Sequence, residues 1–128
     1  MSYYISKTIN ATFEAAVEKV TEELKKEGFG IITEINIQET LKKKLDVDIQ
    51  KYRILGACNP RYAHEALQIE EKIGTMLPCN IIVVEKGPAF TEVSAINPLV
   101  SMQTVNNPVL NAIAAQVTEK LQKVIELL

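Results

Sequence analysis

An uninterrupted aliphatic segment constrains the fold more than any other part of the sequence. Residues 80–85 read Asn-Ile-Ile-Val-Val-Glu, which is the length of a strand and lacks alternation between apolar and polar residues. Such a run predicts a central strand with both faces at least partly covered. Residues 86–88, Lys-Gly-Pro, then predict a turn, and residues 90–96 predict a hairpin neighbour.

The remaining strands and helices are predicted from the spacing of apolar residues and from residues that favour turns and helix ends. Strands are predicted over residues 3–9, 28–36 and 49–58. The clearest helix starts after Thr12, a good N-cap, and ends before Gly28. Its apolar residues recur at helical spacing and form one stripe: Phe13, Val17, Val20 and Leu24.

Three further helices are predicted from asparagine-led starts. Asn36, followed three residues later by Glu39, resembles a capping box and opens a short helix with Ile37, Leu41 and Leu45 on one side. Asn-Pro pairs at 59–60 and 107–108 open the other two, with proline at the first helical position. We expect the helix after residue 60 to span residues 62–73.

These elements predict one α+β domain over residues 1–128. We expect a single mixed or antiparallel sheet of about five strands with helices packed against it. A net charge of −2 and an aromatic content of 5% argue against a nucleic-acid partner. No segment is apolar enough to span a membrane, and residues 1–10 lack the layout of a signal peptide. We therefore expect a cytoplasmic protein with no membrane partner.

The two cysteines lie in related settings, Gly-Ala-Cys58-Asn-Pro and Leu-Pro-Cys79-Asn. In a cytoplasmic protein both are expected to be reduced thiols. Cys58 precedes a helix start, where backbone N–H groups stabilise a thiolate, so it is a candidate reactive thiol. The alternative for both is a small buried hydrophobe at a strand end. If the strand that starts at Cys79 runs antiparallel to the strand that ends at Cys58, the two cysteines lie close together. If the two strands are parallel, the cysteines lie at opposite edges of the sheet.

His64, the single histidine, is the natural third ligand for a zinc or copper site with the two cysteines. The three residues lack the close spacing typical of such sites, and a helical wheel places His64 on the solvent side. Asn59 and Asn80 are predicted to be capping or turn residues. Alternatively, their amides flank a thiol and polarise a bound carbonyl or sulfur species.

Glu70 falls inside the apolar arc of the same helix, so a buried carboxylate there needs an ion-pair or hydrogen-bond partner. Arg53 and Lys51 are the nearest candidates in the sequence. The alternative is that the helix frays before Glu70 and the side chain reaches solvent.

Several segments together resemble the small bacterial family called domain of unknown function 302. They are residues 28–45, 52–60 (YRILGACNP), 63–67, 73–85 (IGTMLPCNIIVVE) and 96–98. The resemblance implies a compact, often self-associating α+β domain with no agreed activity and no established catalytic residues. Similar chains tend to read Glu-Ile-Asp where this chain has Glu34-Ile35-Asn36, so this chain lacks the carboxylate at residue 36.

Three functions are compatible with these features. We favour a non-catalytic binding or interaction domain that acts as a homodimer, because the helix over 108–128 carries more apolar positions than one small sheet is expected to cover. The second is a thiol site centred on Cys58 that handles a sulfur species or a soft metal. The third, acid–base catalysis by Glu70 with His64, is weakened by their separation of about 120° around the helix. The sequence identifies neither a cofactor nor a particular small ligand.

Overall fold

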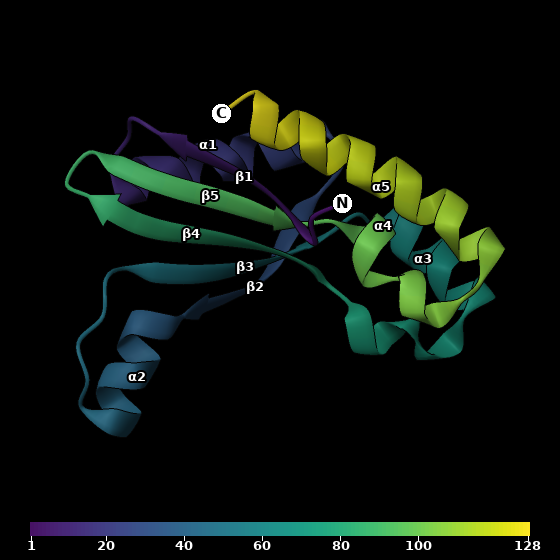
Figure 1. The fold of residues 1–128 in the computed structure, drawn as a ribbon, viewed down its shortest axis with the longest axis horizontal. Coiled ribbons are helices and arrows are strands. Elements are labelled where there is room, and N and C mark those ends of the chain that lie inside the picture. The colour runs from purple at the N-terminus through teal and green to yellow at the C-terminus, as the bar shows by residue number, and fades with distance from the viewer.

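The computed structural model describes residues 1–128 and contains one five-stranded sheet (Figure 1). Its strands are β1 (Tyr4–Ile9), β2 (Gly30–Asn36), β3 (Tyr52–Cys58), β4 (Cys79–Gly87) and β5 (Phe90–Ile96). The helices are α1 (Phe13–Lys26), α2 (Ile37–Leu45), α3 (Pro60–Ile69), α4 (Pro98–Ser101) and α5 (Pro108–Glu126). Two 3-10 turns, η1 (Glu71–Met76) and η2 (Gln103–Val105), complete the chain.

The sheet has the order β1-β5-β4-β3-β2, and every neighbouring pair is antiparallel. This confirms the α+β class and shows that the sheet is antiparallel rather than mixed. The aliphatic segment around residues 80–85 forms the central strand β4, and β5 is its hairpin neighbour, as predicted. The two edge strands of the sheet are short, with six residues in β1 and seven in β2.

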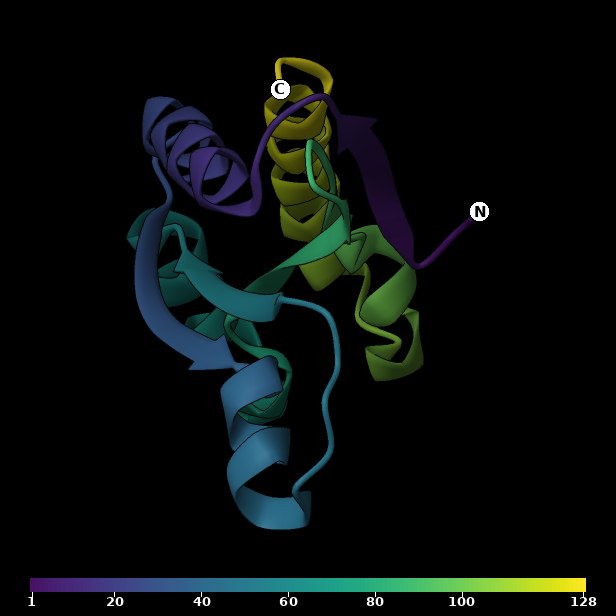
Figure 2. The ribbon, with the colours of Figure 1, turned by 90° about the vertical axis from the view of Figure 1, so that its left-hand side faces the viewer.

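One face of the sheet is covered by α1 and α5 (Figure 2). Inward-facing residues of β3, β4 and β5 meet the apolar stripes of these two helices in a main core of 18 buried residues. A second cluster joins α3, η1 and the beginning of α5. Its five buried residues are Ala66, Ile73, Met102, Leu110 and Ala114. The two clusters therefore share α5. The first half of this helix contributes to the second cluster, and its second half contributes to the main core.

The apolar side of α5 is buried within its own chain, which corrects the expectation of surplus apolar surface on this helix. Leu110, Val117, Leu121 and Val124 all lie in one of the two clusters. Val109, at the start of the helix, is the exception and is 60% exposed.

The predicted caps are largely present. The Thr12 hydroxyl accepts from Ala15 N, Asn36 Oδ1 accepts from Glu39 N, and Asn107 Oδ1 accepts from Val109 N. A third Asn-Pro pair, Asn97 and Pro98, opens α4, a helix that the sequence analysis did not identify. Because α4 has only four residues, it is too short to show a periodic pattern.

The helix predicted over residues 62–73 is in fact divided. It ends at Ile69, and Glu70 adopts an extended conformation before the chain continues as η1. The division lets Ile73 turn into the second cluster, where it is fully buried. None of the helices has the length and apolarity needed to cross a membrane.

Candidate functional site

The antiparallel pairing of β3 and β4 brings the two cysteine segments together. Cys79, the first residue of β4, lies opposite Ala57, so Cys58 at the end of β3 is one position away. The antiparallel alternative for their arrangement is therefore the correct one. Both residues are free thiols.

Both thiols contribute to the wall of an apolar cavity of about 290 Å³. The cavity lies between the main core, represented by Phe29 and Val117, and the second cluster, represented by Ala66 and Met102. Fifteen of its 18 lining residues are hydrophobic. They come from the end of the sheet, from α3 and from the first half of α5, the region where α3 and α5 lie close together in Figure 1.

Small side chains account for the unfilled volume. Four alanines line the cavity: Ala57 on β3, Ala63 and Ala66 on α3, and Ala114 on α5. Protein interiors are normally packed without voids of this size, and larger residues at these positions would close the space. The alanines on facing helices are the sequence feature from which the cavity could have been suspected. They do not stand out in the sequence, because alanine is common in helices.

Two polar side chains reach the cavity wall. Asn59, the residue before α3, does not cap the helix with its side chain; its Nδ2 instead donates to Glu27 O at 3.3 Å. This bond ties the end of β3 to the turn after α1 and leaves Asn59 Oδ1 without a partner in the chain. The hydroxyl of Tyr62, on the first turn of α3, also has no partner in the chain. An apolar molecule with one hydroxyl or amide group could use either.

The two thiols differ in their surroundings. Cys79 is 9% exposed, and this burial raises the pKa of its thiol to about 11, with the nearby Cys58 as a smaller contribution. Cys79 therefore stays protonated at neutral pH and behaves as a small apolar group. Cys58 is half-buried, so its sulfur is more accessible.

The structure does not bring His64 to these thiols. His64 is exposed on α3, does not line the cavity, and belongs to no group of three or more possible metal ligands. The candidate zinc or copper site of Cys58, Cys79 and His64 is therefore not formed. Asn80 is exposed on β4 opposite Gly56 and also lies outside this cavity.

Glu70 is half-buried at the end of α3, where the helix stops before it as the alternative interpretation expected. The suggested partners are engaged elsewhere. Lys51 Nζ lies 2.7 Å from Glu14 Oε1, and Arg53 Nη1 lies 3.2 Å from Glu34 Oε1. An ion pair between Glu70 and either residue is therefore absent, and nothing joins Glu70 to a catalytic arrangement with His64.

Comparison with known proteins agrees with the sequence resemblance. A family model described as domain of unknown function DUF302 matches residues 5–128. The crystal structure of an uncharacterized conserved DUF302 protein from Bacillus stearothermophilus is similar, with a TM-score of 0.91 and 26% sequence identity. The similarity covers 98% of each chain. Among curated proteins no match is found. The chain therefore belongs to the DUF302 family.

Proposed function

We propose that this domain is a binding protein that takes a small apolar molecule into the cavity between its two core clusters. The observation that carries the proposal is the lining itself, because 15 hydrophobic residues surround about 290 Å³ at the junction of two packed clusters. Small-molecule sites are typically concave and largely apolar, with a few polar groups that orient the ligand. Asn59 and Tyr62 are suitable for that second role.

The size of the cavity bounds the ligand. Dry apolar cavities of about 150 Å³ in other proteins take up benzene, so a cavity of about 290 Å³ has room for a larger apolar group. Each CH₂ group that leaves water contributes about 0.8 kcal/mol. An alkyl or aromatic compound with one terminal hydroxyl or amide group therefore fits both the volume and the polar groups at the wall.

A series of straight-chain alcohols tests this proposal. We expect the affinity, measured by isothermal titration calorimetry, to rise about fourfold for each added CH₂ from 1-butanol upward. The increase should stop once the chain fills the cavity. Affinities that are undetectable across the series, or that rise without a limit, would count against a cavity of defined size.

Two neighbouring alanines on α5 provide matched variants for the same titration. Ala114 is buried and lines the cavity, whereas Ala115 is exposed. Ala114→Leu places extra carbon atoms in the cavity and should weaken 1-octanol binding at least tenfold, while Ala115→Leu should leave it unchanged. Equal affinities in the two variants would place the bound alcohol elsewhere.

A second candidate is a thiol site at Cys58, because this half-buried sulfur opens onto the same cavity. In this function Cys58 would contact a sulfur species or a soft metal at the cavity wall. Iodoacetamide provides the test: the Cys58 sulfur forms a bond to carbon, iodide leaves, and the thiol proton passes to solvent. We expect iodoacetamide to modify Cys58 in the folded protein, and 1-octanol to slow this reaction. Cys79 should be modified only after the protein unfolds. Peptide mass spectrometry that finds both modified equally fast would contradict this assignment.

A further inference from the structure

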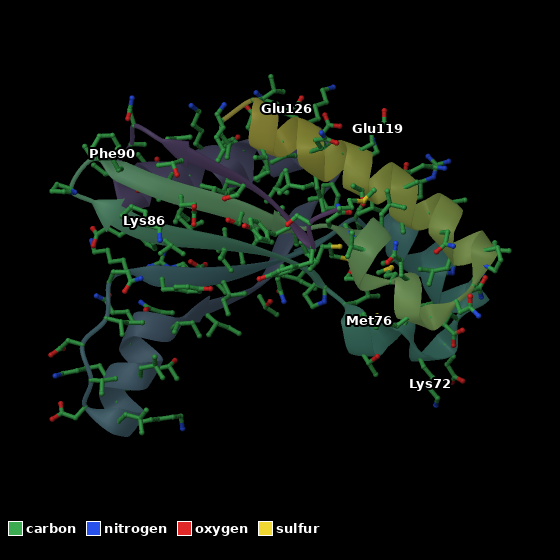
Figure 3. All side chains as sticks on the ribbon, viewed as in Figure 1. Lys72, Met76, Lys86, Phe90, Glu119 and Glu126 are labelled. Carbon is green, nitrogen blue, oxygen red and sulfur yellow. The ribbon has the colours of Figure 1, made fainter.

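A second cavity, called the polar cavity here, lies beside the apolar cavity that separates the two core clusters. Its volume is about 270 Å³, close to the 290 Å³ of the apolar cavity, but only five of its 10 lining residues are hydrophobic. It lies where η1 leads into β4, near Met76 (Figure 3). Its polar lining comes from three elements, with Thr75 on η1, Asn80 on β4 and Ser101 on α4.

The two cavities share a wall. Five residues line both of them: Leu77, Pro78, Cys79, Pro98 and Met102. These residues belong to two segments, the chain that enters β4 at residues 77–79 and the short helix α4 with the residue that follows it. A single layer of residues therefore separates the apolar cavity from the polar one. Met102 is the wall residue best suited to move aside, because its side chain is unbranched and flexible.

The polar side chains of the polar cavity are available to a ligand. Asn80 is exposed and Ser101 is half-buried, and neither side chain forms a hydrogen bond within the chain. The Thr75 hydroxyl donates to Lys72 O at 2.9 Å and can still accept a hydrogen bond. An amide and a hydroxyl both donate and accept. The three residues together therefore suit a group that carries several hydroxyl or amide functions.

Charge restricts that group further. Neither cavity is lined by an aspartate, glutamate, lysine, arginine or histidine. Lys72, on the adjoining turn η1, is exposed and points away from the body of the domain (Figure 3). A charged group in the polar cavity would lose hydration without gaining an opposite charge, which is costly. The lining therefore favours an uncharged polar group.

We propose that the ligand is an uncharged amphiphile, with its apolar part in the apolar cavity and its polar head group in the polar cavity. This inference rests on the proposed function and extends it to the head group. Since a cavity of about 150 Å³ takes up benzene, about 270 Å³ has room for a six-membered ring that carries hydroxyl groups, such as a sugar. The ligand would pass between residues 77–79 and Met102.

NMR of the methionine methyl groups tests the proposal with two probes that carry the same alkyl chain, 1-octanol and n-octyl glucoside, both below micelle-forming concentrations. The three methionines report on different places. Met102 lines both cavities, Met76 lines the polar cavity alone, and Met1 lines neither and is 91% exposed. We expect 1-octanol to shift the Met102 signal only. Octyl glucoside should shift the signals of Met102 and Met76, and the Met1 signal should stay unchanged with both probes.

Isothermal titration calorimetry of three variants measures the contribution of the head group. Asn80→Ala and Ser101→Ala should each weaken octyl glucoside binding about fivefold, because each removes a hydrogen-bond partner, and should leave 1-octanol affinity within about twofold. Asn111→Ala is the matched control, because Asn111 is exposed on α5 and lines neither cavity. Octyl sulfate, with the same chain and a charged head, should bind about tenfold more weakly than octyl glucoside.

The outcomes distinguish this inference from the proposed function. A Met76 signal that octyl glucoside leaves in place, while 1-octanol shifts Met102, would overturn the role of the polar cavity alone. Octyl glucoside affinities that neither Asn80→Ala nor Ser101→Ala changes, or octyl sulfate binding as tight as that of octyl glucoside, would do the same. A Met102 signal that neither probe shifts would overturn the proposed function and this inference together.

Discussion

Asn97→Ala is expected to lower the free energy of unfolding by about 3 kcal/mol, whereas Asn107→Ala lowers it by about 1 kcal/mol. Both asparagines precede a proline and cap a helix through their side-chain oxygen. Asn107 is half-buried and its side chain makes only the capping hydrogen bonds, so its loss costs about what an ordinary N-cap contributes. Urea unfolding followed by circular dichroism measures the two values side by side.

The larger effect at Asn97 comes from its burial. Its Oδ1 accepts from Thr118 Oγ1 at 3.1 Å and from Leu99 N at 3.2 Å, and its Nδ2 donates to Ser2 O at 3.1 Å. Asn97 and Thr118 are 6% and 7% exposed. Alanine would remove the acceptor of a buried hydroxyl, which costs about 1 to 3 kcal/mol beyond the lost cap. Equal losses in the two variants would mean that the buried network contributes nothing beyond capping.

Alkaline pH is expected to destabilise the fold through Cys79. Burial raises the pKa of this thiol from its ordinary value of 9.0 to about 11. Its folded-state pKa thus exceeds its unfolded value, so the contribution to stability is fully present below pH 9 and is lost as the pH rises to about 11. Two pKa units correspond to about 2.7 kcal/mol.

The free energy of unfolding should therefore be measured at intervals from pH 8 to pH 11 in the unmodified chain and in two variants. Between pH 8 and pH 11, the free energy of unfolding of Cys79→Ala should fall by about 2 to 3 kcal/mol less than that of the unmodified chain. Cys58→Ala, the matched control, should follow the unmodified chain, because desolvation of Cys79 is the larger cause of the shift. Identical profiles for the two variants would contradict the assignment. All other ionisable groups are common to the two variants and the unmodified chain, so the comparison isolates the two thiols.

The fold was largely predictable because its elements carry strong local patterns. The aliphatic run of β4 indicates its central place, and Thr12, Asn36 and Asn107 mark helix starts where the structure has them. The direction of β4 relative to β3 was left open, since a helix and a 3-10 turn between two strands permit either direction. Pairing across the sheet, with Ala57 opposite Cys79, decides it.

The candidate site was less accessible from the sequence. Cys58, Cys79 and Asn59 were singled out and do lie together, but the feature that unites them is a cavity left by alanines from β3, α3 and α5. A cavity that results from small side chains has no recognisable motif in the sequence. Glu70 was misplaced because the wheel assumed a continuous helix to residue 73, whereas α3 ends at Ile69. The role of Asn97 depends on Thr118, which is 21 residues away.

Methyl-resolved NMR during titration with 1-octanol shows whether an apolar molecule occupies the cavity between the two core clusters. We expect the methyl signals of cavity-lining Ala57, Ala66, Met102 and Ala114 to shift. The signal of Ile54, on the sheet face that points away from the main core, should stay unchanged. Cavity methyl signals that stay in place at saturating 1-octanol, or shifts of equal size at Ile54, would contradict the proposed function.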